Sequence, residues 1–94
     1  MADEGYKDII SAILEQKVRS FGQLAVMRAK SIKGLEIDAD RNITSLSGDP
    51  QEILRDLIKS FEEIAGKIST VTIKKVIFPI LQQYPDIVLP EELK

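Results

Sequence analysis

The chain has 94 residues, of which 44% are hydrophobic and 30% charged, values typical of one folded domain. Its 13 basic and 15 acidic residues leave a net charge of −2, whereas nucleic-acid-binding proteins usually carry a basic excess. There is no cysteine and no histidine, which excludes disulfides, zinc–sulfur sites and the commonest general base. No apolar run approaches the roughly 20 residues that span a bilayer, and the acidic start lacks a signal peptide's features. We therefore expect a cytoplasmic protein that binds neither nucleic acid nor membrane.

The first predicted element is one long helix over about residues 3–32. Its apolar residues recur at spacings of mostly three and four, at Tyr6, Ile10, Ile13, Leu14, Val18, Phe21, Leu24, Ala25 and Ile32. Acidic residues gather near its start and basic residues near its end, as the helix dipole favours. Gly34 is a natural C-terminal stop.

A short two-stranded hairpin is predicted over about residues 35–47. Its turn contains three residues that alternate as the first ligands of a calcium loop would: Asp38, Asp40 and Asn42. An EF-hand loop also needs glycine at its sixth position and glutamate at its twelfth, but Ile43 and Asp49 stand there. Asp and Asn tolerate left-handed backbone, so we predict a turn and keep the three residues only as a candidate metal site.

The next predicted element is a helix over about residues 50–65. Asp49 is its expected N-cap, and Pro50 occupies the first helical position. Its apolar stripe is out of phase with the apolar residues that follow. We therefore expect a break or bend at Gly66 or in the β-branched run Thr70–Ile73 rather than one continuous helix.

The last predicted helix covers about residues 69–84, and an extended tail covers residues 85–94. Pro79 lies inside this helix and should kink or shorten it, and Pro85 should end it. The predicted fold is thus a single domain over residues 1–94, α+β and helix-dominated. This order of elements resembles, in architecture alone, small modules attached to microbial signalling proteins.

One face of the first helix, through residues 10, 14, 17, 21, 24 and 28, forms an apolar seam. Two charged residues interrupt this seam. Lys17 and Arg28 fall on it, on either side of Phe21, although a buried charge is costly unless it is paired. We interpret both as long stems that cover apolar surface while their charged heads reach solvent. The alternatives are that they hold an anionic ligand or face carboxylates of a second chain. Replacement by alanine should then cost more stability at Arg28 than at Lys17, because the planar guanidinium of arginine suits a buried carboxylate.

A second apolar surface is indicated near the C-terminus. Phe78 lies outside the main stripe of the last helix, and the tail carries the apolar run Ile87, Val88 and Leu89. We expect the tail to dock in extended form on the protein's own core or on that of a neighbour. A peptide motif that another protein recognises is the alternative.

The sequence predicts no enzyme and no cofactor, because serine and threonine without histidine have only lysine as an activating base. A first helix of ~28 residues would be ~42 Å long, although the expected radius of gyration of the domain is only ~12–13 Å. Such a helix overhangs its domain, so we predict a homodimer with this helix at the interface.

The predicted function is therefore a non-enzymatic protein-interaction or regulatory module that acts as a homodimer, with another protein as a possible partner. The alternative is a sensor that holds a small apolar or anionic ligand between its helices. In that case Lys17 or Arg28 would be the polar handle for the ligand.

Overall fold

The computed structural model describes residues 2–93, which form four α-helices, two strands and one short 3-10 helix. In chain order these are α1 (Ala2–Phe21), α2 (Gln23–Lys30), β1 (Leu35–Ile37), β2 (Ile43–Leu46), α3 (Pro50–Ala65), α4 (Ile68–Gln83) and η1 (Glu91–Leu93). The predicted helix-dominated α+β fold, with a hairpin between the first and the last helices, is confirmed.

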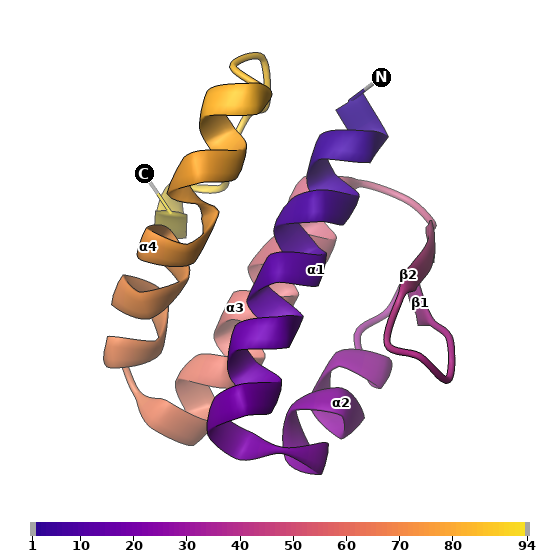
Figure 1. Ribbon diagram of the computed structural model, residues 1–94, viewed down its shortest axis with the longest axis vertical. Coiled ribbons are helices and arrows are strands. Elements are labelled where there is room, and N and C mark those ends of the chain that lie inside the picture. The colour runs from indigo at the N-terminus through magenta and orange to yellow at the C-terminus, as the bar shows by residue number, and fades with distance from the viewer. Residues whose placement is uncertain (1, 94) are drawn as a thin grey trace.

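Helix α1 runs through the middle of the molecule, with α4 on one side and the hairpin on the other (Figure 1). It contacts α2, α3, α4 and β2, so its apolar residues form the centre of the core. Fully buried side chains on three helices share this core: Ile9, Ile10, Ile13, Leu14, Leu54, Leu57, Ile58, Phe61, Ile73 and Ile77. Burial of this apolar surface is the main force that holds the helices together.

The single helix predicted over residues 3–32 is wrong, because the chain turns sharply at Gly22. This residue has φ 62° and ψ −137°, a conformation that residues with a β-carbon rarely adopt. Helix α2 then packs against α1, α3 and β1, which buries Ala25, Val26 and Ala29. The Cα radius of gyration is 11.9 Å and the longest dimension is 31 Å. The ~42 Å helix that motivated the predicted homodimer is therefore absent.

The hairpin forms as predicted. Strands β1 and β2 are antiparallel, with Leu35 opposite Leu46 and a bulge between Glu36 and Ile37. Asp38 stabilises the turn, because its Oδ1 accepts hydrogen bonds from the backbone N–H groups of Asp40 and Asn42, both at 2.9 Å. This is the local bonding that favours Asp in turns.

Helices α3 and α4 are separate, and the predicted break at Gly66 is confirmed. Asp49 caps α3, since its side chain accepts a hydrogen bond of 2.9 Å from the backbone N–H of Gln51. Helix α4 continues past Pro79 to Gln83, so the proline does not shorten it, and it ends before Pro85 as predicted.

The C-terminal tail docks on the protein's own core. Ile87 and Leu89 pack against it, and the hydroxyl of Tyr6 donates a hydrogen bond of 2.6 Å to the carbonyl of Val88. The tail lies so close to α1 that a β-carbon at Gly5 would collide with the Ile87 side chain. Within residues 2–93, no helix is both long and apolar enough to cross a membrane.

Candidate functional site

Lys17 is almost completely buried, with only 2% of its surface exposed. Its Nζ donates a hydrogen bond of 3.3 Å to the backbone carbonyl of Ser69 and lies 5.9 Å from the centre of the Phe61 ring. Burial lowers the pKa of Lys17, because the interior favours the neutral amine. The prediction that the Lys17 amine reaches solvent is therefore wrong.

The hydroxyl of Ser69 is buried beside this amine. Its Oγ has no hydrogen-bond partner among the described residues, and the amine of Lys17 bonds to the carbonyl rather than to the hydroxyl. Both residues are at most 2% exposed, so a substrate or a ligand could reach them only if the bundle opened. The predicted ligand-handle role of Lys17 stays a prediction.

Arg28 lies in a different environment. Its side chain is 38% exposed, and its guanidinium forms an ion pair of 3.6 Å with the carboxylate of Glu63. This pair links α2 to α3 at the surface, where ion pairs contribute little. Phe21 is half-buried and packs against the core. The charged groups of Lys17 and Arg28 thus have different partners, and neither pairs with a carboxylate at the core.

The candidate metal residues are engaged within their own turn. Besides the two backbone bonds, Asp38 accepts a bond of 3.5 Å from the side-chain amide of Asn42. These hydrogen bonds, above all the one from the backbone of Asn42, lower the pKa of Asp38. Across residues 2–93, no group of three or more acidic side chains is arranged to hold a metal ion.

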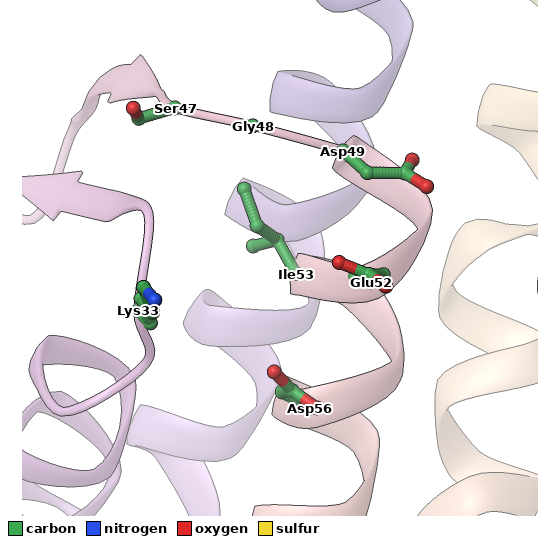
Figure 2. A pocket seen from close by; sticks show the side chains of 7 residues that line it. All are labelled: Lys33, Ser47, Gly48, Asp49, Glu52, Ile53 and Asp56. Atoms are coloured by element: carbon green, nitrogen blue, oxygen red, sulfur yellow. The ribbon is translucent and has the colours of Figure 1, made fainter.

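A shallow pocket of about 170 Å³ lies where the hairpin meets the start of α3 (Figure 2). Seven residues line it: Lys33, Ser47, Gly48, Asp49, Glu52, Ile53 and Asp56. Three of the seven lining residues are acidic, and the Asp49 carboxylate already caps α3 and points away from Lys33 (Figure 2). None of the predicted site residues lies in it, so it is a poor match for the predicted apolar or anionic ligand.

The side of α4 that faces away from the bundle carries three large exposed apolar residues. Ile68 is 65% exposed, Val71 47% and Phe78 60%. The opposite side of the same helix is buried through Ser69, Ile73 and Ile77. Helix α4 lies at the edge of the molecule, on the side away from the hairpin (Figure 1).

The same side of α4 is basic. Three lysines lie between Glu63 and Asp86 and no acidic residue does, although the chain as a whole has a net charge of −2. All three lysines are exposed. We call Ile68, Val71 and Phe78, together with Lys67, Lys74 and Lys75, the α4 outer face.

Phe78 and the residues of the tail differ in exposure. Ile87 and Leu89 pack inwards, whereas Val88 is 53% exposed and Phe78 belongs to the α4 outer face. From the sequence, Ile68 was assigned to the apolar stripe of the preceding helix, which is wrong because it begins α4 and is 65% exposed, and the three lysines were given no role. The missed signal was a long stretch without acidic residues that coincides with out-of-phase apolar positions.

Comparisons of this chain with protein-family models, with curated proteins and with solved structures gave no significant match.

Proposed function

We propose that this chain is a non-enzymatic protein-interaction module that binds its partner through the α4 outer face. One observation supports the proposal: Ile68, Val71 and Phe78 are all about half exposed or more on one side of one helix. Single exposed apolar residues are ordinary, but several along one helix form the kind of face that docks against another protein. These three residues span roughly 15 Å of helix at 1.5 Å per residue.

The homodimer remains a separate prediction, because α1 ends at Phe21 and no longer supplies its original reason. A dimer could instead use α2, where Leu24 and Met27 are exposed. Light scattering over a range of micromolar concentrations would show a doubled mass if the dimer forms. A constant monomer mass would reject the homodimer without affecting the proposed role of α4.

Site-specific photocrosslinking in the native host tests the proposed function. A photoreactive residue at Val71 should crosslink to one specific protein, whereas the same residue at exposed Glu36, in the hairpin on the other side of the molecule, should not. Phe78→Asp in the Val71-labelled chain should abolish the crosslink. Circular dichroism must show that this variant melts like the parent, as expected for an exposed position.

Equal crosslinking from both positions would contradict the proposal. So would a Val71 crosslink that persists in the Phe78→Asp variant, because the partner would then not depend on the largest apolar side chain of the α4 outer face.

A further inference from the structure

The charge of the α4 outer face differs from that of the rest of the protein. Helix α4 and its flanks hold three of the 13 basic residues and none of the 15 acidic ones, so the remainder of the chain is clearly negative. The acidic residues at the end of α3 are already engaged: Glu62 accepts a hydrogen bond of 2.8 Å from Thr70, and Glu63 pairs with Arg28. The charged side chains of this face itself are therefore all basic, while Glu62 of α3 and Glu91 of η1 lie on elements that contact α4.

The apolar residues of this face follow helical spacing. Ile68 and Val71 are three residues apart, and Phe78 lies seven residues after Val71. Lys75 lies between them, four residues after Val71 and three before Phe78, so its aliphatic stem borders both. The result is a strip one helix wide, in which the cationic heads of the lysines lie beside and between the apolar side chains. This shape matches a helical partner with apolar residues at i, i+3, i+4 and i+7.

From this combination we infer that the partner is an amphipathic α-helix of another protein with acidic residues beside its apolar stripe. It would lie along α4 and add one more helix to the edge of the bundle. This inference rests on the proposed function and adds the chemistry of the partner. Carboxylates at the margins of the stripe would pair with Lys67 and Lys75, and the apolar stripe would cover Phe78 and Val71.

A second copy of this chain fits the face less well. A symmetric pair formed through α4 would bring two sets of three lysines together with no acidic residue on either helix. Docking of α4 on an acidic face of another copy would be head-to-tail, and such contacts propagate unless they close a ring. An anionic lipid surface would also attract the lysines, but it would repel the negative remainder of the domain.

Two designed peptides test the inference. One is an amphipathic helix with leucine at helical spacing and glutamate beside the stripe, and the other has every glutamate replaced by lysine. With the full chain labelled with nitrogen-15, the acidic peptide should shift the amide signals of residues 67–78, and the lysine peptide should not. The apparent affinity should fall as salt is added, because exposed charge pairs are screened.

Three variants give the expected magnitudes. Lys67→Glu and Lys75→Glu should each weaken binding of the acidic peptide by roughly two- to fivefold, whereas the matched change Lys33→Glu at the distant pocket should not. Phe78→Ala should weaken it roughly tenfold, because the aromatic anchor of the face is lost. All of these side chains are exposed, so each variant should keep the parent's melting temperature.

Other outcomes overturn the inference in distinguishable ways. If the lysine peptide binds as well as the acidic one, or if Lys33→Glu weakens binding as much as Lys75→Glu, the partner is not selected by charge. The proposed function would survive that result as long as the Val71 crosslink forms. If neither peptide binds but the chain sediments with vesicles of phosphatidylcholine and phosphatidylserine, the face recognises a lipid surface instead. Failure of the Val71 crosslink itself would reject the proposed function.

Discussion

Replacement of Lys17 by methionine removes a buried charge while it keeps a long unbranched side chain. The hydrogen bond that the structure gives this amine runs to the neutral carbonyl of Ser69, which does not offset burial of a cation as a carboxylate would. We therefore expect Lys17→Met to be as stable as the parent at neutral pH, or more stable by about 1 kcal/mol. Ser69 lies within α4, so its carbonyl keeps its helical hydrogen bond.

Lys17→Ala is the matched comparison, because it removes the charge and most of the buried stem. Three methylenes are lost at about 0.8 kcal/mol each, so this variant should be about 2–3 kcal/mol less stable than Lys17→Met. The difference between the methionine and alanine variants measures the packing of the stem. The difference between the parent and the methionine variant measures the charged amine.

The effect of the charge should depend on pH. Burial lowers the pKa of Lys17 in the folded protein below its ordinary value of 10.5. Below the folded pKa both states are protonated and the burial cost is present in full. Between the folded pKa and 10.5, the unfolded chain binds a proton that the folded protein lacks, so stability rises with pH. The advantage of Lys17→Met over the parent should therefore shrink as the pH rises towards 10.5.

Urea unfolding followed by circular dichroism, at neutral and at alkaline pH, measures these differences. The reasoning is refuted if Lys17→Met loses as much stability as Lys17→Ala and the gap from the parent does not change with pH. In that case the amine would stabilise the fold by more than its burial costs.

Three further predictions concern other parts of the structure. Gly22→Ala should lower the free energy of unfolding by about 1–3 kcal/mol in urea titrations, because φ is 62° there, whereas a continuous helix would gain about 1 kcal/mol from alanine. Arg28→Ala should cost less than about 1 kcal/mol by thermal melting, since its ion pair with Glu63 is exposed, which reverses the order expected from the sequence. The hydroxyl of Tyr84 donates a hydrogen bond of 2.8 Å to Asp8, which raises the pKa of the phenol above its ordinary value of 10.0. In a Tyr6→Phe background, ultraviolet titration reports the phenol of Tyr84, and its midpoint should be lower after Asp8→Asn. The stability that the hydrogen bond contributes should be lost as the pH rises through the raised pKa of Tyr84.

Local signals were sufficient for much of the fold. The start of α3 was predictable because Asp49 and Pro50 cap a helix through bonds and dihedral angles within a few residues. The hairpin turn followed from Asp38, whose side chain bonds to its own loop. The change in phase between two apolar stripes predicted a break in the region of residues 66–73, and the structure places it at Gly66. Each of these signals lies within one continuous stretch of chain, so the sequence contains every residue that takes part in it.

Tertiary packing decided the features on which the site depends. Gly22 is compatible with a helix interior or with a sharp turn, and the burial of Ala25, Val26 and Ala29 selects the turn. Helical periodicity places Lys17 on the α1 seam whether or not its amine reaches solvent. In the structure, the start of α4 covers this amine and keeps it from solvent. The outer face of α4 is exposed because the elements that contact this helix bury it on the side of Ser69, Ile73 and Ile77. Periodicity tells which residues share a face of a helix, whereas burial and exposure depend on which distant elements cover that face, and no local pattern records them.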